Sequence, residues 1–295
     1  MKIEYRKCRK KDLIPAAYLI RTSFNHLRKS TGKEIRRYHI TRLMEPEHLY
    51  KYDHDTWYCA CAGKKMVGFA AALIRGKQWF LAYLFVHPSY QDKKVGKELL
   101  KRVWRNTLGM SHSLCTFAYN MQAVGIYSIF GMVPLCTLPI MEVSLDKLTI
   151  LKAISLKVRT KPTTLDLAWI NRLEKKIRGY SRPQEWQFWS KLNEVQIFVF
   201  EDKGRRVGYS MMYKSGAICP AGAISNVYLT KVMSETLRLF KPKKKKIRTI
   251  CPTHNLELYQ FLIKLGFRLI EMDIFMSDKP YADFQRYLPA QLAIF

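Results

Sequence analysis

The chain has 295 residues, 48% of them hydrophobic, with 51 Lys and Arg against 23 Asp and Glu and a formal net charge of +28. This length suits two domains, each large enough for a hydrophobic core, and the apolar content is that of a globular protein. No apolar run approaches the ~20 residues that span a bilayer, and the basic N-terminus lacks the apolar segment of a secretion signal. The sequence therefore predicts neither a membrane segment nor secretion.

The cysteines predict a reducing compartment. They are odd in number and scattered, at Cys8, Cys59, Cys61, Cys115, Cys136, Cys219 and Cys251. This distribution is typical of free, mostly buried thiols and not of a disulfide framework. The Cys59-Ala60-Cys61 pair is too closely spaced for a zinc site and has no second Cys or His pair at ligand spacing. We therefore expect a cytoplasmic protein without a bound metal.

The first half reads as a strand and helix followed by a meander. Residues 3–8 alternate as a strand does, and Asp12 is placed to cap the next helix. Apolar segments separated by short turns predict antiparallel strands at 57–62, 66–74 and 79–86. The elements expected after them are a helix at 96–107, a strand at 113–119, a helix at 121–130 and strands near 132–143.

A basic turn after the strand at 79–86 has the properties of a phosphate-binding loop. It runs directly into an amphipathic helix that carries Leu99, Leu100 and Val103. Unpaired amides at a helix N-terminus point at a ligand, and the helix dipole favours negative charge there. Gly96 allows a close backbone approach. The predicted phosphate-binding residues are Gln91, Asp92, Lys93, Lys94, Val95, Gly96 and Lys97.

This turn resembles the acyl-CoA pyrophosphate loop of the GNAT superfamily of N-acyltransferases, whose pattern is Gln/Arg-x-x-Gly-x-Gly/Ala. Gln91 and Gly96 match the pattern, and Lys94 stands at the first glycine. Downstream, TFAYNMQAVGIYSIFGMVPL resembles the second acyl-CoA segment of the superfamily, with matches at Asn120, Ala123, Tyr127, Gly131 and Met132. The segment 65–70 resembles the preceding hairpin strand. The resemblance covers residues 1 to about 145.

The second half resembles a second copy of the first. Gly204 to Tyr209 repeats the hairpin, and Asn255 to Gly266 repeats the spacing of Asn120 to Gly131. The basic turn is missing from the second copy, and Leu262 stands where the first copy has Tyr127. The resemblance implies an α/β fold of the α+β type, in which each domain has a mixed, largely antiparallel sheet flanked by helices. We predict a domain with the acyl-CoA loop at 1–147 and a degenerate domain at 148–295, with the linker near 147–152.

The resemblance also implies an activity: transfer of an acetyl group from acetyl-CoA to a primary amine, in the first domain only. In the superfamily, backbone groups of the central strand, here at Phe85 and Val86, hold the pantetheine arm and polarise the thioester. Tyr127 matches the tyrosine that protonates the leaving thiolate, although it could instead be a core aromatic. Asn120 and Ala123 match the segment that contacts the cofactor, and Asn120 could simply cap the helix.

The general base is left unassigned. The central strand QWFLAYLFV has no acidic residue. Tyr83 and His87 are near enough in sequence to consider, but a water chain could replace either of them. His87 before Pro88 reads as a loop residue more than as a base.

The charge suggests an anionic partner. It divides evenly, with +14 in residues 1–147 and +14 in 148–295. Such a charge attracts polyanions, so an acidic protein or RNA could bind in addition to CoA, or the charge could serve solubility. Residues 1–42 carry 13 Lys and Arg against Glu4, Asp12 and Glu34, and in GNAT-like folds this region roofs the acceptor site. The acceptor amine is therefore expected to carry anionic groups. Two other readings remain: a catalytically inactive acyl-CoA-binding adaptor, and a nucleic-acid-associated protein.

Overall fold

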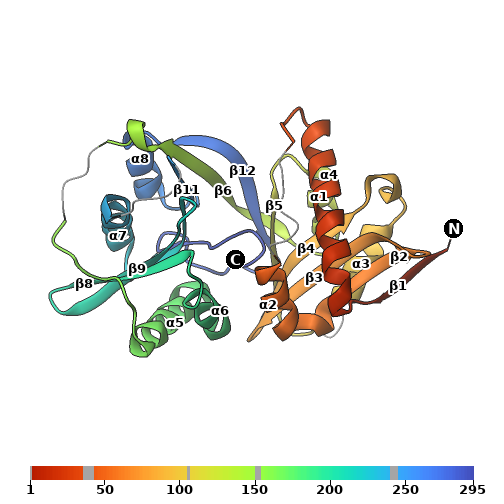
Figure 1. The fold of residues 1–295 in the computed structure, drawn as a ribbon, viewed down its shortest axis with the longest axis horizontal. Helices are drawn as coiled ribbons and strands as arrows, with labels where there is room; N and C mark the ends of the chain where they lie inside the picture. The colour runs from red at the N-terminus through yellow and green to blue at the C-terminus, as the bar shows by residue number, and fades with distance from the viewer. Residues whose placement is uncertain (1, 36–42, 105–106, 150–153, 240–244) are drawn as a thin grey trace. The chain divides into compact units, whose positions relative to one another are not determined.

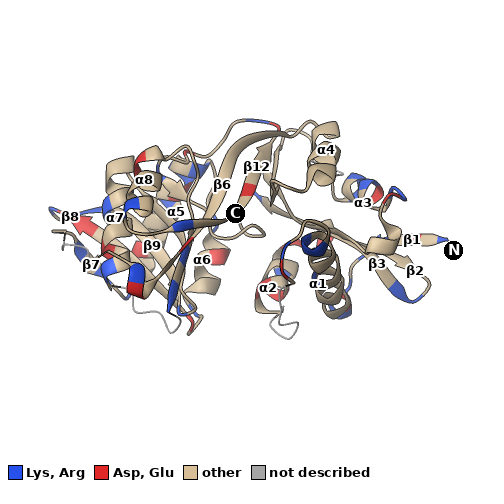
Figure 2. Ribbon diagram, turned by 90° about the horizontal axis from the view of Figure 1, so that it is seen from above, with Lys and Arg blue, Asp and Glu red and all other residues tan. Residues whose placement is uncertain are grey.

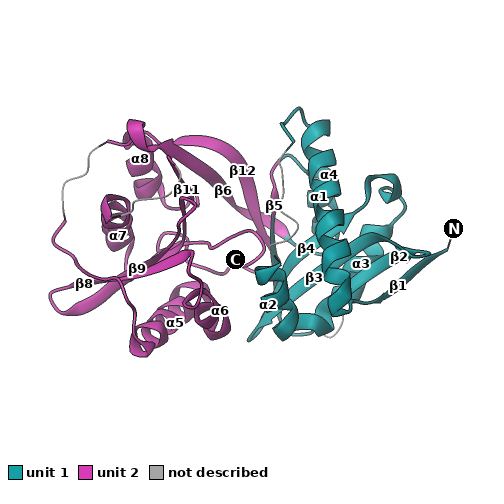
Figure 3. Cartoon of the chain, in the orientation of Figure 1, with its two compact units in different colours: residues 1–115, 119–132 teal, residues 116–118, 133–295 magenta. Residues whose placement is uncertain are grey.

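The computed structural model describes residues 2–35, 43–104, 107–149, 154–239 and 245–295, which form two compact units (Figures 1 and 3). Unit 1 comprises residues 1–115 and 119–132, and unit 2 comprises residues 116–118 and 133–295. Both are mixed α/β units with largely antiparallel sheets, as the sequence predicted.

Unit 1 is built on a five-stranded sheet in the order β1-β2-β3-β4-β5. All pairs are antiparallel except β4 with β5, which is parallel. Helices α1 and α2 cover one face, and α3 and α4 lie on the other (Figure 2). The elements are β1 (Ile3–Lys7), α1 (Leu13–Ser30), α2 (Met44–Asp53), β2 (Trp57–Ala62), β3 (Lys65–Arg75), β4 (Gln78–Val86), α3 (Val95–Val103), β5 (Ser111–Phe117) and α4 (Met121–Ile129). The meander is confirmed, and the helix expected at 96–107 is found as α3, which ends earlier, at Val103.

A glycine in β3 sets how closely α3 approaches the sheet of unit 1. A Cβ built on Gly68 would lie 2.8 Å from Leu99 Cδ1 and 2.9 Å from Val95 Cγ1, closer than real Cβ atoms come to a neighbour. Val95 and Leu99 are themselves almost fully buried. The missing side chain therefore allows the first turns of α3 to pack directly on the strand, next to the basic turn.

Unit 2 contains the order β12-β6-β11-β10-β9-β8-β7, with β13 pairing β10. Helices α5 and α6 lie on one side of β8–β10, and α7 and α8 lie on the other (Figure 1). The elements are β6 (Val133–Ser144), β7 (Lys157–Arg159), α5 (Thr164–Arg178), α6 (Pro183–Trp189), β8 (Val195–Asp202), β9 (Arg205–Tyr213), β10 (Ala217–Ala223), α7 (Asn226–Leu239), β11 (Lys246–Ile250), α8 (Leu256–Lys264), β12 (Arg268–Ser277) and β13 (Tyr287–Leu288).

Strand β6 belongs to unit 2, although it precedes the predicted linker. It pairs antiparallel with β11 on one edge, from Lys246 opposite Ser144, and with β12 on the other, to Ser277 opposite Val133. From residue 133 onward the chain belongs to unit 2 without interruption. The boundary at 147/148 was drawn from the repeat in sequence and stays a prediction. Residues 150–153 of the predicted linker region lie outside the described part of the chain.

Landmarks of the sequence repeat take the same local structure in both copies. Gly208 in β9, like Gly68, has no room for a side chain, since its Cβ would lie 2.6 Å from Val232 Cγ2 on α7. The His87 amide donates to Val67 O at 2.9 Å, and the Ile224 amide donates to Val207 O at 2.9 Å. Ile224 is therefore the counterpart of His87.

The last helix of each copy, α4 or α8, is capped at both ends in the same way. Asn120 and Asn255 are its N-caps, accepting from the amides of Ala123 and Leu258. Gly131 and Gly266 follow its C-terminal end with φ values of +87° and +96°, which favour glycine. These shared caps explain why the two segments have equal spacing.

A buried ionic cluster organises unit 2. Glu174 of α5 accepts from Arg178 Nη1 at 2.9 Å, from Arg182 Nη2 at 2.8 Å and from the Tyr209 hydroxyl at 2.8 Å. All three charged side chains are at most 1% exposed. Burial opposes ionisation of Glu174, but Arg182 and Arg178 outweigh it and lower its pKa. Both guanidinium groups also donate to the Phe295 carbonyl, so the cluster ties the end of the chain to α5.

Three further properties bear on the class of protein. All seven cysteines are free. Of the helices in the described ranges, none is long and apolar enough to cross a membrane. Within the same residues, no group of three or more His, Cys, Asp and Glu side chains is arranged to hold a metal ion.

Candidate active site

The end of β4 is an open edge in the sheet of unit 1. The described parallel pairing with β5 runs only from Gln78 opposite Ser111 to Leu81 opposite Leu114. Pairing with β3 on the other side continues to Val86, with an irregularity next to Ala82. The two parallel strands thus part after Leu81, and the backbone of the last β4 residues faces the gap between them. An extended ligand can pair with a strand edge of this kind through main-chain hydrogen bonds.

The register decides which backbone groups face this open edge. Because the His87 amide donates to Val67 O and Gly68 lies opposite Val86, residues 85 and 87 bond towards β3. Leu84 and Val86 alternate with them and direct their N–H and C=O groups away from β3. Of the two predicted strand residues, Val86 is therefore placed to meet a ligand, and Phe85 is engaged with β3. Leu84 was missed because register cannot be read from a single strand.

The carbonyl of Val86 is held from two sides. It accepts from Ser23 Oγ of α1 at 2.9 Å and from Gln91 Nε2 of the basic turn at 3.2 Å. Gln91 therefore anchors the turn to the strand end. The side chains of Phe85 and Val86 are half-buried, because the sheet has parted here.

The basic turn holds two non-glycine residues with left-handed backbone. Asp92 has φ 60°, and Lys94, the N-cap of α3, has φ 60° and ψ 8°. Lys94 thus takes a conformation that glycine adopts freely, at the position of the pattern's first glycine. The carboxylate of Asp92 accepts from Gln122 Nε2 of α4 at 2.6 Å. Strained residues of this kind occur preferentially at ligand-binding sites.

The N-terminus of α3 follows directly. Val95 buries its side chain in the core, so only its amide can meet a ligand. A Cβ on Gly96 would lie 3.5 Å from Val86 Cγ2, an ordinary contact. Lys93 donates to Ser89 O at 2.9 Å and lies over the Tyr90 ring, and the Lys97 side chain is exposed. The turn combines helix-terminal amides with positive charge, as an anion site requires.

Helix α4 carries the remaining predicted residues. Asn120 Oδ1 accepts from the Ala123 amide at 3.3 Å, which is the capping role left open above. Contacts of Asn120 and Ala123 with pantetheine stay a prediction. Tyr127 is 6% exposed, and burial raises the pKa of its hydroxyl above the usual value near 10. The hydroxyl is therefore protonated at neutral pH, the state that a general acid needs.

Three residues near the end of β4 are considered as the general base, and one of them, Glu45, remains a candidate. Burial, with a smaller contribution from Glu45, raises the pKa of Tyr83 and keeps its hydroxyl protonated, so it cannot accept a proton. His87 Nδ1 accepts from the Ser89 amide at 3.3 Å, and Nε2 lies 3.5 Å from Lys65 Nζ. Burial, Lys65 and His26 lower the pKa of His87. Glu45, at the start of α2, brings a carboxylate near a strand that has none of its own.

The predicted cationic roof is only partly realised in the described residues. Helix α1 does cover β3 and β4. However, Arg6 pairs with Asp12 at 2.7 Å, and the buried Arg28 donates to Glu34 O at 2.6 Å. Part of the roof, at 36–42, lies outside the description. Lys and Arg are distributed over both units (Figure 2).

Comparison with known proteins agrees with this geometry. Residues 24–132 match the Acetyltransferase (GNAT) family. The structure is similar to that of a putative acetyltransferase from Pyrococcus horikoshii, with a TM-score of 0.72 and 16% identity over 99% of this chain and 92% of that chain. A GCN5-related N-acetyltransferase from Sphaerobacter thermophilus gives 0.66 and 15%, over 96% of this chain and 98% of that chain.

A third similar structure is a tandem GNAT protein from the clavulanic acid biosynthesis pathway. Its TM-score is 0.61, with 12% identity over 95% of this chain and 99% of that chain. At these identities the likeness shows a shared fold, and it extends over nearly the whole chain. No curated protein matches the sequence.

Proposed function

We propose that this chain transfers an acetyl group from acetyl-CoA to a primary amine, in unit 1 only, because residues 24–132 match the Acetyltransferase (GNAT) family. The observation that carries the proposal is the parting of β4 from β5 beside the basic turn. It offers the Leu84 and Val86 backbone to the pantetheine arm and the N-terminus of α3 to the pyrophosphate. In unit 2, α7 begins two residues after Ile224, whereas α3 begins eight residues after His87, so the second copy has no comparable turn.

The reaction joins the amine nitrogen to the thioester carbonyl carbon and breaks the bond from carbon to sulfur. The Val86 amide is placed to stabilise charge on the carbonyl oxygen. Tyr127 donates its proton to the departing thiolate. We assign the proton lost by the amine to Glu45, whose charge acts on Tyr83 of the central strand.

Two charge features support a proposal about the acceptor. The charge of Glu45 acts on Tyr83 of the central strand and favours an ammonium group beside that residue. The excess of Lys and Arg in residues 1–42 favours an acceptor that also bears carboxylate or phosphate groups. We therefore propose an amino acid or an acidic peptide amine, in preference to a polyamine.

Calorimetric titration with acetyl-CoA tests the cofactor site. The chain should bind one equivalent, and Gly96→Glu should abolish binding because it places a carboxylate at the helix terminus. The matched control is Val227→Glu, at the second position of α7 and 49% exposed, which should leave affinity unchanged. Two equivalent sites per chain, or equal affinity in the Gly96→Glu variant, would contradict the proposal.

Kinetics with a panel of amines of graded charge test the chemistry. Tyr127→Phe should lower turnover by roughly 10- to 1,000-fold with little change in acetyl-CoA affinity. Glu45→Gln should lower turnover and remove the acidic limb of the pH profile. A preference for spermidine over acidic peptides would refute the acceptor proposal. Tight binding of acetyl-CoA without turnover of any amine would instead indicate an acyl-CoA-binding adaptor.

A further inference from the structure

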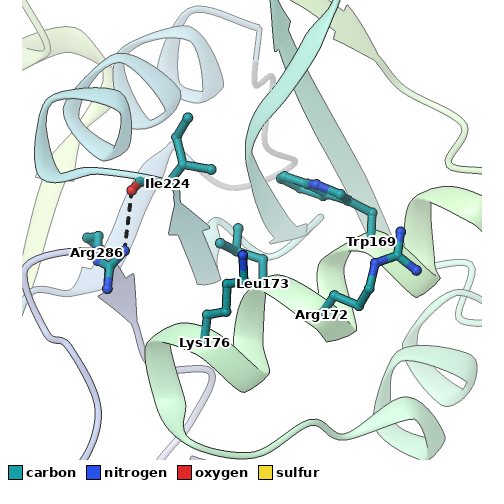
Figure 4. Close-up of a pocket in the computed structure, with 6 residues that line it drawn as sticks. All are labelled: Trp169, Arg172, Leu173, Lys176, Ile224 and Arg286. Atoms are coloured by element: carbon teal, nitrogen blue, oxygen red, sulfur yellow. Dashed lines mark hydrogen bonds between the residues drawn. The ribbon is translucent and has the colours of Figure 1, made fainter.

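A pocket in unit 2 lies on one face of α5. Its volume is about 270 Å³, just below the usual range of roughly 300–1,000 Å³ for ligand sites, so only a small molecule fits. The lining residues are Trp169, Arg172, Leu173, Lys176, Ile224 and Arg286. The first four follow the spacing i, i+3, i+4, i+7, so a single helix face forms one wall. Ile224 and Arg286 approach from the opposite side (Figure 4).

The charged side chains that line this pocket are all cationic. Three of its six lining residues are Arg or Lys, and none is acidic. Arg286 is bonded to Asp283 through Nε at 2.5 Å and to Ile224 O through Nη1 at 3.4 Å, and is thereby fixed at the rim. Arg172 and Lys176 are exposed and lie four residues apart on α5. Like charges at this spacing repel each other, and an anion bound between them would reduce that repulsion.

The other surfaces of the pocket are apolar and partly flat. The Trp169 indole, half-buried, provides a planar wall beside Leu173 and Ile224 (Figure 4). An indole face binds flat rings by stacking, and arginine binds carboxylate or phosphate through paired donors. The combination suits a small molecule with a flat ring and an anionic group, and the three cationic side chains disfavour cations.

The position of the pocket within unit 2 is informative. Ile224 is the counterpart of His87, so the pocket opens at the end of β10 that corresponds to the candidate thioester end of β4. Helix α5 stands beside β10 as α1 stands beside β4. The second copy has a short connection in place of the phosphate turn but has kept a concave site on the acceptor side.

We propose that unit 2 binds a small planar organic anion in this pocket, at the place where unit 1 would receive its acceptor. The charge is recognised by Arg172, Lys176 and Arg286, and the ring stacks on Trp169. This site does not depend on acetyl transfer by unit 1. Both an aromatic carboxylate and a nucleoside monophosphate have a flat ring and an anionic group, and the experiment distinguishes between these two ligand classes.

The test is calorimetric titration of the full chain with AMP and with 4-hydroxybenzoate, in the presence of saturating CoA to occupy unit 1. Adenosine and 4-hydroxybenzamide are the uncharged counterparts. At least one of the two anions should bind with a dissociation constant below about 1 mM, and its uncharged counterpart should bind at least about tenfold more weakly. Which anion binds identifies the ligand class. Failure of both anions, or equal binding of the neutral counterparts, would overturn the proposal.

Single substitutions test whether the anion binds in the pocket on α5. Arg172→Gln and Lys176→Gln should each weaken binding about tenfold, and Trp169→Leu should weaken it for both anions. Lys175→Gln removes an exposed charge from the same helix outside the pocket and should have little effect. Gly96→Glu should also leave binding intact. If the anion binds equally to the Arg172 and Lys176 variants but not to Gly96→Glu, it occupies unit 1 and the assignment to α5 is wrong. Circular dichroism of each variant verifies the fold.

Discussion

Lys94→Gly should stabilise the protein, because the lysine holds a backbone conformation that suits glycine. Its φ of 60° and ψ of 8° cost an L-residue about 1–2 kcal/mol. Glycine avoids that cost but loses roughly 0.5–1 kcal/mol more conformational free energy on folding. The side chain of Lys94 is exposed, so its removal leaves no cavity. The expected net gain is about 0.5–1 kcal/mol, or a rise in Tm of roughly 1–4 °C.

Lys94→Ala is the matched control, because it removes the same charge and keeps the strained φ. The glycine variant should therefore exceed the alanine variant by about 1 kcal/mol in urea unfolding. A second control, Asp92→Gly, should gain less, since aspartate tolerates left-handed backbone better than lysine and this one also bonds Gln122.

The same variants test the turn as a cofactor site. If its shape holds the pyrophosphate, Lys94→Gly should bind acetyl-CoA at least as tightly as Lys94→Ala, because both lack the charge and only glycine fits the turn. Equal unfolding free energies for the glycine and alanine variants would show that Lys94 is not strained, and the account of this turn would fail.

Other parts of the structure give three further predictions. Gly68→Ala should destabilise the protein by about 1–3 kcal/mol in urea unfolding, because the new Cβ would overlap with Leu99. Gly125→Ala has nothing within 4 Å of its Cβ and should stabilise α4 by up to about 1 kcal/mol. The reverse order of the two variants would contradict the packing of α3 on β3. The lowered pKa of His87 means that the unfolded chain binds its proton more readily, so this contribution to stability is present above about pH 6.5 and lost as the pH falls. His87→Gln should flatten the dependence of Tm on pH in that window. An unchanged dependence would mean that His87 is not the group responsible for it. Glu174→Gln leaves two buried arginines without their carboxylate and should cost about 3–5 kcal/mol by chemical denaturation; a cost below 1 kcal/mol would mean that water reaches the cluster.

Local patterns were sufficient for the elements and for the repeat. Alternation and turn residues located β2, β3 and β4, because strand periodicity and turn chemistry are properties of a few neighbouring residues. The equal spacing from Asn120 to Gly131 and from Asn255 to Gly266 predicted two like segments, since a helix with an Asn cap and a following glycine is encoded within a dozen residues. The basic turn was visible for the same reason.

What depends on distant parts of the chain could only be decided by tertiary structure. Strand β6 pairs with β11 and β12, which follow it at a distance along the chain, and such strand partners are chosen by the hydrogen bonds of whole sheets. The identity of Leu84 and Val86 as the open backbone follows from register with β3. Glu45 and the pocket on α5 were likewise missed, because each joins residues that are far apart in sequence and share no local signal. Residue types along the chain thus specified the helices and strands of each copy. Tertiary packing determined where the charged side chains gather and which strand edge stays open.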